Sequence, residues 1–161
     1  MEQNFGIEMN KKVSVIREFM NSEENKLGLP LPKGKVRMYR RDEQGRLQFT
    51  GENEIDHTPR DEKVRMKSGE AFDLVGERLQ TNFVADSSRR MIDESFEITL
   101  RNHKEEPVEI QVIEHLYRYM TWEITESTVP HEKLDTRTAR FKVQVPAHGE
   151  QKMTYNVRYT W

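Results

Sequence analysis

Hydrophobic and polar residues alternate with a period of two along much of the chain. The clearest row closes the sequence, where polar residues separate five apolar ones: Met153, Tyr155, Val157, Tyr159 and Trp161. Similar alternation fills residues 96–101, 108–112 and 141–145. This period is typical of a half-buried strand, because successive side chains point to opposite faces of a sheet. We expect no helix, except that a helix would be tolerated within residues 1–12.

The alternation predicts an all-β fold, an antiparallel immunoglobulin-like β-sandwich with additional N-terminal β-hairpins. The strands from about residue 71 onwards are enough for the sandwich. Earlier strands, beginning with Val13–Met20, form a second β layer or subdomain. We therefore divide the chain into residues 1–68 and 69–161. The polar segment 86–90 is expected to be an exposed loop.

Turn residues predict three hairpins between neighbouring strands. Asp42-Glu43-Gln44-Gly45 has the aspartate and glycine of a type I turn, and segments 102–107 and 146–149 also connect alternating rows. A slip of one residue would turn each apolar row into water, so the registers are strongly specified. The expected cross-strand partners are Met38–Phe49 and Arg40–Leu47; Leu100–Val108, Ile98–Ile110 and Phe96–Val112; and Val145–Met153, Val143–Tyr155 and Phe141–Val157.

Charge predicts a fourth hairpin around residues 57–62, because acidic residues precede the loop and basic residues follow it. The expected pairs are Asp56–Lys63, Glu54–Arg65 and Glu52–Lys67, with Ile55 against Val64 on the reverse face. Each exposed pair contributes only about 0.2–1 kcal/mol. Their main effect is to disfavour slipped registers.

Composition narrows the class of protein. The 161 residues are 34% hydrophobic and 34% charged, which suits one ordinary domain or two small sandwiches with thin cores. The strict alternation of β-branched and aromatic residues argues against disorder. A net charge of −2 with interleaved signs gives no footprint for nucleic acid. The absence of cysteine excludes disulfides and thiolate zinc sites, but leaves the compartment open.

No apolar run reaches the roughly 20 residues that span a bilayer, and the first residues lack the apolar stretch of a signal peptide. No histidine pair has the helical spacing of a zinc site, and no nucleophile elbow occurs. Alternation places Glu52, Glu54 and Asp56 on a solvated strand face rather than in a cleft. We therefore expect no catalytic residue, no metal site and no cofactor. His57 beside Asp56 is the best exception, because a carboxylate can orient an imidazole.

Aromatic residues are the strongest candidates for an interaction surface. Tyr117 and Tyr119 are expected on one strand face, where exposed rings can stack on sugars or anchor a partner. Trp122 belongs to the same group, with burial in the sandwich as its alternative role. Trp161 ends an apolar row that is left bare unless something covers it. The possible interaction surface is Tyr117, Tyr119, Trp122 and Trp161.

Several segments carry a family resemblance. They are residues 27–39 (LGLPLPKGKVRMY), 49–52 (FTGE), 55–59 (IDHTP), 69–78 (GEAFDLVGER), 100–104 (LRNHK) and 155–159 (YNVRY). Together they resemble the C-terminal β-rich domain of a prokaryotic family of unknown function, the mucoidy-inhibitor-like proteins. The resemblance covers most of residues 13–161, and LPLPKGKVRMY is its most specific part. The aromatic segment 117–122 departs from the family pattern.

The resemblance implies that the chain is a C-terminal fragment of a longer protein whose N-terminal region carries coiled-coil segments. It also implies an envelope-associated or extracellular location, and it supplies no catalytic residues.

We expect a non-catalytic module that docks a protein partner or its own upstream region, by strand-edge pairing or through residues 117–122. The alternatives are a module that binds carbohydrate or an envelope polymer, and an accessory domain of a hydrolase with catalytic residues upstream. Neither nucleic acid binding nor membrane insertion is expected. The fold alone does not choose among these functions.

Overall fold

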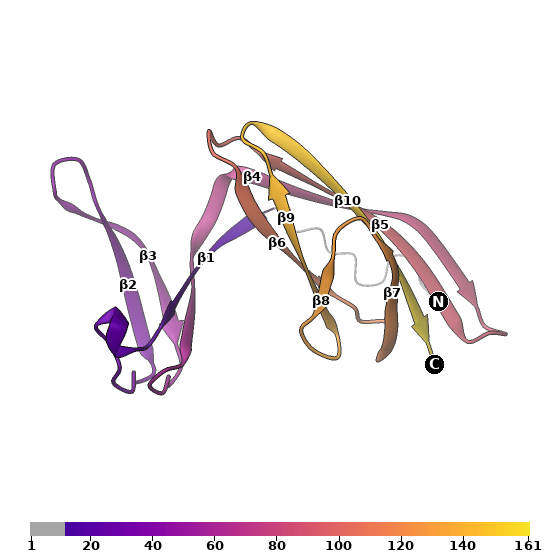
Figure 1. Ribbon diagram of the computed structural model, residues 1–161, viewed down its shortest axis with the longest axis horizontal. Coiled ribbons are helices and arrows are strands. Elements are labelled where there is room, and N and C mark those ends of the chain that lie inside the picture. Colours follow the sequence, from indigo (N-terminus) through magenta and orange to yellow (C-terminus); the bar gives the residue numbers. More distant parts are fainter. Residues whose placement is uncertain (1–11) are drawn as a thin grey trace. The chain divides into compact units, whose positions relative to one another are not determined.

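The computed structural model describes residues 12–161, and in this part of the chain the protein is all-β and antiparallel (Figure 1). The strands are β1 (Lys12–Met20), β2 (Gly34–Arg41), β3 (Leu47–Ile55), β4 (Lys63–Asp86), β5 (Met91–Asn102), β6 (Val108–His115), β7 (Thr121–Ser127), β8 (His131–Lys133), β9 (Thr138–Val145) and β10 (Gly149–Thr160). The helical turn η1 (Glu23–Asn25) is the one helical element among them.

The helix tolerated within residues 1–12 falls almost wholly outside the described residues, and Lys12 begins β1. No helix within residues 12–161 has the length and apolar character needed to cross a membrane.

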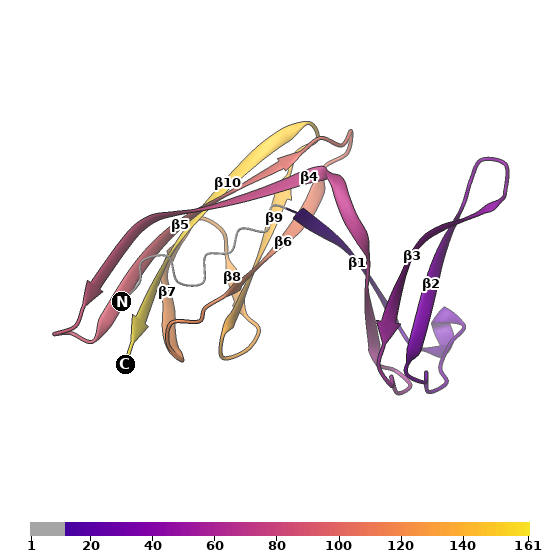
Figure 2. The ribbon, with the colours of Figure 1, turned by 180° about the vertical axis from the view of Figure 1, so that it is seen from behind.

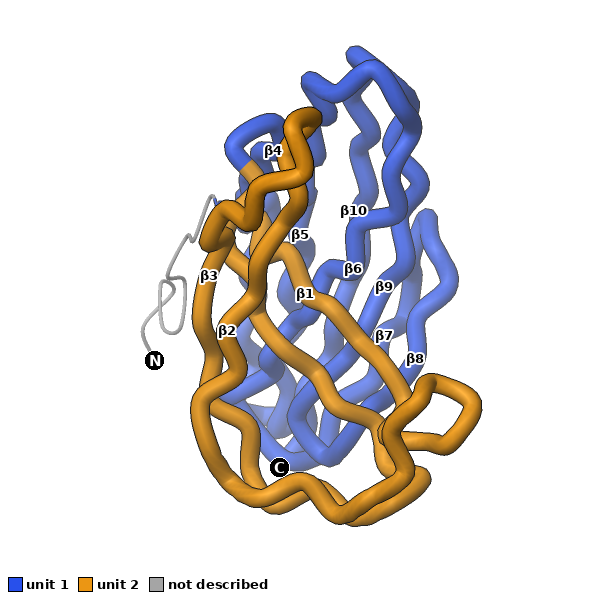
Figure 3. Tube along the Cα trace, turned by 90° about the vertical axis from the view of Figure 1, so that its left-hand side faces the viewer, with its two compact units in different colours: residues 1–12, 72–161 blue, residues 13–71 orange. Residues whose placement is uncertain are grey.

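The strands form three sheets, with the orders β1-β4-β5-β10-β7, β2-β3 and β6-β9-β8. The described chain divides into two compact units, shown in Figure 3. Unit 2 comprises residues 13–71, and unit 1 comprises residues 72–161 together with residue 12. Strand β4 contributes to both units. The expected boundary between residues 68 and 69 lies close to this division, and the folding of either part as a separate domain stays a prediction.

The core of unit 1 is built from the alternating rows that the sequence shows. In β5, β9 and β10 one face is buried and carries mainly apolar side chains: Ile92, Phe96, Ile98, Leu100, Phe141, Val143, Val145, Met153, Tyr155, Val157 and Tyr159. The ring of Tyr155 lies 5.2 Å from that of Phe96 and 5.2 Å from that of Phe141. Because Phe141 is on β9, the β6-β9-β8 sheet faces β5 and β10 across this core (Figures 1 and 2).

The opposite face of β4, β5 and β10 carries cross-strand ion pairs. Arg158 binds both carboxylate oxygens of Asp93, at 2.8 and 3.0 Å. Arg101 binds Glu77 on one neighbouring strand and Glu150 on the other, each at 2.9 Å. These exposed pairs contribute little stability each, but a slipped register would break several of them together.

Two of the expected hairpins are wrong, because the chain changes sheet where a turn was predicted. Strand β5 pairs with β4 and β10, so Leu100 lies opposite Gln151 rather than Val108. Strand β9 pairs with β6, so Val145 lies opposite Val108 rather than Met153. The apolar faces of β9 and β10 do meet, but across the core instead of along one sheet.

The buried side chain of Asn102 joins the two places where the chain changes sheet. Its Nδ2 donates to the carbonyl oxygens of Glu106, at 2.8 Å, and Pro146, at 3.0 Å. Its Oδ1 accepts from the backbone N–H of Lys104 at 2.9 Å. One side chain therefore replaces the backbone pairing that a hairpin would have supplied.

In unit 2 the β2-β3 hairpin forms as expected, but its register is shifted by one residue. Tyr39 lies opposite Phe49 and Arg41 opposite Leu47, where the sequence predicted Met38 and Arg40 in those places. The reason is the turn, in which Asp42 N–H donates to the carbonyl of Arg46. Gly45 has a φ of +78°. A three-residue loop with a left-handed glycine shifts the pairing relative to a plain type I turn.

The charged hairpin expected around residues 57–62 is also wrong. Strand β3 pairs with β2, and β1 lies along β4. Glu52 therefore binds Lys35 and Arg37, each at 3.1 Å. The cations of β4 bind Glu18 of β1, with Arg65 at 2.6 Å and Lys63 at 3.6 Å. The charge pattern identified the solvated faces but not the strands that would neutralise each other.

The loop expected at residues 86–90 does form, as the exposed turn between β4 and β5. Asp86 Oδ1 accepts from the backbone N–H groups of Ser88, at 2.9 Å, and Arg89, at 3.1 Å. This use of an aspartate side chain to satisfy turn amides is why such residues favour turns.

Candidate functional site

The structure brings together two of the aromatic residues that the sequence singled out. Tyr119 lies between β6 and β7, and Trp161 follows β10. Their rings stack with centroids 4.6 Å apart and planes 12° apart. The backbone N–H of Trp161 donates to the carbonyl of Arg90 at 3.2 Å, which holds Trp161 beside the turn between β4 and β5. Trp161 remains partly exposed.

Tyr117 and Met120 are exposed in the same connection, and the Tyr117 ring stacks on His115 at 5.7 Å. We call Tyr117, Tyr119, Met120 and Trp161 the aromatic corner. The expectation that Tyr117 and Tyr119 share a strand face is wrong, because residues 116–120 belong to no strand. The segment is shaped instead by inward-facing neighbours, since the side chains of Leu116 and Arg118 are buried.

Trp122 takes the alternative role that the sequence allowed. Its side chain is buried, and its indole N–H donates to the carbonyl of Thr136 at 2.8 Å. The ammonium of Lys133 lies 4.4 Å from the indole centroid. Trp122 therefore supports unit 1 from within and adds no exposed contact to the aromatic corner.

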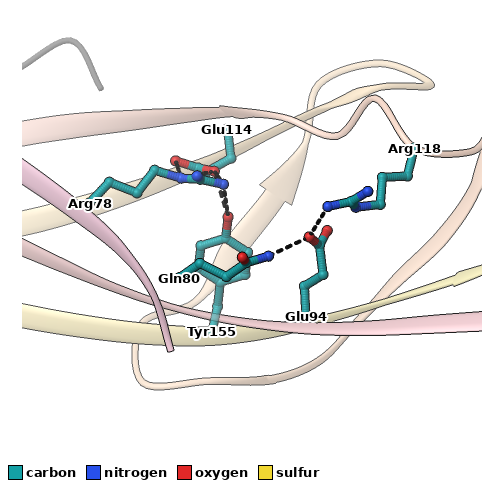
Figure 4. A network of polar contacts seen from close by, with 6 residues as sticks. All are labelled: Arg78, Gln80, Glu94, Glu114, Arg118 and Tyr155. Carbon is teal, nitrogen blue, oxygen red and sulfur yellow. Dashed lines mark hydrogen bonds and ion pairs between the residues drawn. The ribbon is translucent and has the colours of Figure 1, made fainter. Parts of the chain in front are cut away.

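A buried polar network lies inside unit 1 (Figure 4). Arg78 Nε donates to both carboxylate oxygens of Glu114, at 3.2 and 3.0 Å. The hydroxyl of Tyr155 donates to Glu114 Oε2 at 2.5 Å. The guanidinium carbon of Arg78 also lies 3.8 Å from the centroid of the Phe96 ring. Strands β4, β5, β6 and β10 are joined by these contacts.

The second half of the network centres on Glu94. Arg118 Nη2 lies 2.7 Å from Glu94 Oε1, and the side chains are 6% and 3% exposed. Gln80 Nε2 donates to the same oxygen at 2.6 Å. The Arg118 guanidinium also lies 4.8 Å from the centroid of Phe83. A buried carboxylate and a buried guanidinium are tolerated together because each neutralises the other.

The tyrosines of β10 are kept neutral. Burial raises the pKa of Tyr155 well above its usual value of 10, and the nearby Glu114 carboxylate raises it further. Burial likewise raises the pKa of Tyr159, followed by the charge of Glu94. The Tyr155 phenol is therefore a hydrogen-bond donor at neutral pH and not a base.

The network is consistent with a structural role. Each of its carboxylates is held by an arginine and by a second donor. These contacts join four strands of unit 1 and hold Arg118, so the geometry indicates support for the fold and for the segment that carries the aromatic corner.

Sequence reasoning missed this network because it considered Glu52, Glu54 and Asp56 as candidate carboxylates and left Glu94 and Glu114 out. The signal that could have revealed it is the position of each glutamate in the alternating pattern of buried and exposed residues. Glu94 occupies the buried phase of β5, between Ile92 and Phe96, and Glu114 continues the phase of Ile110 on β6. A charged residue in an apolar row is expected to have a buried partner of opposite charge.

The histidines give no metal site. Among the described residues, no group of three or more histidine, aspartate or glutamate side chains is arranged to hold a metal ion. The imidazole of His57 accepts from the backbone N–H of Lys33 at 3.3 Å. Asp56 Oδ1 accepts from the backbone N–H of His57 at 2.9 Å. The aspartate thus organises the turn rather than the imidazole.

No family model matches the chain, and no curated protein matches it. The resemblance to mucoidy-inhibitor-like proteins stays a prediction from the residues quoted above.

Proposed function

We propose that the chain is a non-catalytic β-sandwich module that docks a protein partner through the aromatic corner. The observation that carries this proposal is the stacked pair of Tyr119 and Trp161. Two segments distant in sequence place their aromatic rings together at a partly exposed position, and Tyr117 and Met120, which are close to Tyr119 in sequence, are exposed as well. Aromatic side chains supply much of the energy of protein interfaces, and exposed apolar groups that gather in one place mark such surfaces.

The setting of the corner supports the same proposal. Arg118, between Tyr117 and Tyr119, is anchored inside unit 1 by its buried ion pair with Glu94. This anchor restrains a segment that has no strand pairing of its own. A surface that is ordered before binding loses less conformational entropy when the partner arrives.

We also propose that unit 1 is a variant of the immunoglobulin-like sandwich. Its strands β4 to β10 form two antiparallel sheets with the orders β4-β5-β10-β7 and β6-β9-β8. The constant-type immunoglobulin order places the fifth strand between the second and fourth, and the seventh at an edge of the other sheet. Counted from β4, the fifth strand is β8 and the seventh is β10. In this protein β10 lies between the second and fourth strands, and β8 lies at the edge of the other sheet. The resemblance to mucoidy-inhibitor-like proteins supports a module at the end of a longer chain.

A second candidate function is carbohydrate or envelope-polymer binding. The observation in its favour is the exposed ring of Tyr117, which lies nearly parallel to the His115 ring, 26° from it. A supported aromatic ring of this kind is a platform on which a sugar can stack.

Affinity capture on immobilised protein, followed by affinity measurement with the purified partner, tests the proposal. The double variant Tyr119→Ala, Trp161→Ala is expected to bind about 100-fold more weakly, because both anchors are lost. The control is Phe72→Ala, Leu79→Ala, which removes two exposed apolar side chains elsewhere in unit 1 and should bind as the native protein does.

Equal binding by the native protein and the corner variant would reject the aromatic corner. A polysaccharide panel, read by tryptophan fluorescence and repeated with Tyr117→Ala, addresses the second candidate. A response that disappears in that variant supports carbohydrate binding, and no response across the panel rejects it.

A further inference from the structure

Strand β2 has an open edge in unit 2. It pairs with β3 in a two-stranded sheet, and among residues 12–161 no other strand pairs with it. The other strand of the hairpin is supported by β4, because Asn53 Nδ2 donates to the carbonyl of Lys67 at 3.1 Å. The outer edge of β2 therefore presents backbone N–H and C=O groups that can pair with an added strand. A two-stranded sheet is only marginally stable, so a third strand would stabilise it.

An apolar patch lies on one face of the same hairpin, near its turn. The patch consists of Tyr39, Leu47 and Phe49, which are 52%, 62% and 59% exposed. Tyr39 and Phe49 are cross-strand partners whose rings meet edge to face at 5.8 Å. Leu47 is two residues before Phe49, so it projects from the same face. The opposite face carries Val36 and Met38, which are less exposed.

Positive charge follows the open edge. Strand β2 contains four cations and no carboxylate: Lys35, Arg37, Arg40 and Arg41. Glu52 of β3 neutralises part of this charge by binding Lys35 and Arg37. Arg41 donates to the carbonyl of Gly45 at 3.1 Å. Within the described residues no carboxylate forms an ion pair with Arg40 or Arg41, and both side chains are exposed.

We propose that this hairpin binds an extended acidic peptide segment of another protein, which adds to the edge of β2 as a third strand. Backbone hydrogen bonds would supply affinity, and side chains would supply specificity. Arg40 and Arg41 project to opposite faces, so acidic residues at successive peptide positions reach one arginine each. An apolar peptide residue on the face that carries the apolar patch would contact Tyr39.

The charge distribution favours a peptide over nucleic acid. Asp42 and Glu43 stand in the turn directly after Arg41, and Asp42 is already bound to Arg46 at 3.0 Å. A nucleic acid strand carries a phosphate at every nucleotide and would meet these carboxylates. A peptide can place its few carboxylates beside the arginines and uncharged residues beside the turn.

The test uses the whole chain and a fluorescein-labelled nine-residue peptide, with one central leucine, two glutamates on either side and two threonines at each end. Fluorescence anisotropy gives its Kd. We expect a micromolar Kd for the native protein and at least about tenfold weaker binding for Arg40→Glu, Arg41→Glu. The matched control Arg17→Glu, Lys26→Glu reverses two exposed charges outside β2 and β3 in unit 2 and should bind within about twofold of the native protein.

Strand addition is tested separately with N-methylated peptides. Alternate amides of an extended peptide point in the same direction, so two peptides are made, one methylated on each alternate set. One of them should lose binding at least about tenfold and the other should retain it.

Three outcomes overturn the proposal. The first is native-like binding by Arg40→Glu, Arg41→Glu. The second is equal binding of the two methylated peptides. The third is a labelled oligothymidine of about ten nucleotides that binds more tightly than the peptide and depends on the same arginines, which would identify a nucleic acid site instead.

Discussion

The hydroxyl of Tyr155 donates a 2.5 Å hydrogen bond to the carboxylate of Glu114, which also binds Arg78. Tyr155 is on β10 and Glu114 is on β6, so this bond joins the two facing sheets of unit 1. Most of the surrounding contacts are apolar and depend little on direction. The polar contacts restrict how the two sheets can be placed, because Tyr155 and Arg78 must both reach the carboxylate of Glu114.

Replacing Glu114 by Gln should destabilise unit 1 by about 2–4 kcal/mol. The charge of Arg78 would then lie largely buried opposite a neutral amide, and removal of one partner of a buried pair is costly. Urea unfolding at pH 7, followed by the fluorescence of Trp122 and Trp161, which both belong to unit 1, measures the loss. Glu150→Gln is the control, since its partner Arg101 is on an exposed face, and its stability should be nearly native. Equal stability of the two variants would contradict the structural role of the network.

Alkaline pH should destabilise the protein through the tyrosines of β10. Burial raises the folded-state pKa of Tyr155 and Tyr159 above the ordinary value of 10. Each therefore contributes stability that is complete below pH 10 and is lost as pH rises above it, because the unfolded tyrosine ionises first. The loss is roughly 1 kcal/mol per pH unit for each tyrosine.

Tyr159→Phe removes one of these two contributions. In urea unfolding between pH 8 and 11, stability of this variant should fall less steeply above pH 10 than that of the native protein. Parallel curves for the two proteins would show that Tyr159 ionises equally in both states and contradict its raised pKa.

The sequence predicted burial better than pairing. Alternation along β5, β9 and β10 identifies the buried side chains, because successive residues of a strand lie on opposite faces and the apolar residues share the face that is buried. Whether Val145 then meets Met153 along a sheet or across the core depends on the connection. Either arrangement buries the same residues, so hydrophobic pattern cannot separate them.

For the candidate site, too, the sequence identified individual residues better than it identified their contacts. Tyr119 was identified as an exposed aromatic residue on a strand face and Trp161 as the end of a bare apolar row, but their stacking depends on the tertiary fold. Glu94 and Glu114 were recognisable as charges in apolar rows. Their partners were less accessible, because Arg118 lies in an irregular segment whose path no local pattern specifies.

Gly45→Ala should weaken the β2-β3 hairpin by about 1 kcal/mol, because φ at Gly45 is +78° and a Cβ disfavours that conformation. Gly34→Ala is the matched control, since a Cβ there meets nothing within 4 Å and its φ lies outside the left-handed region. Amide hydrogen exchange of β2 and β3 measures the effect. Faster exchange is expected in the first variant only, and equal exchange in both would contradict the strained turn.

Asn21→Asp should destabilise unit 2 while leaving unit 1 folded. Asn21 is fully buried, and its Nδ2 donates to the carbonyls of Leu29 and Pro59, each at 2.8 Å. A carboxylate in its place would face those oxygens with no proton to donate, at a cost of about 3 kcal/mol. Hydrogen exchange should accelerate in β2 and β3.

Asn102→Asp is the reciprocal variant, because Asn102 makes the same kind of contact inside unit 1. It should lower the urea midpoint reported by the tryptophan fluorescence of unit 1, whereas Asn21→Asp should leave that midpoint unchanged. The reason is that the buried apolar side chains of β5, β9 and β10 pack against one another within unit 1, whereas the loops that Asn21 holds belong to unit 2. A common fall of both signals in either variant would show that the two units unfold as one.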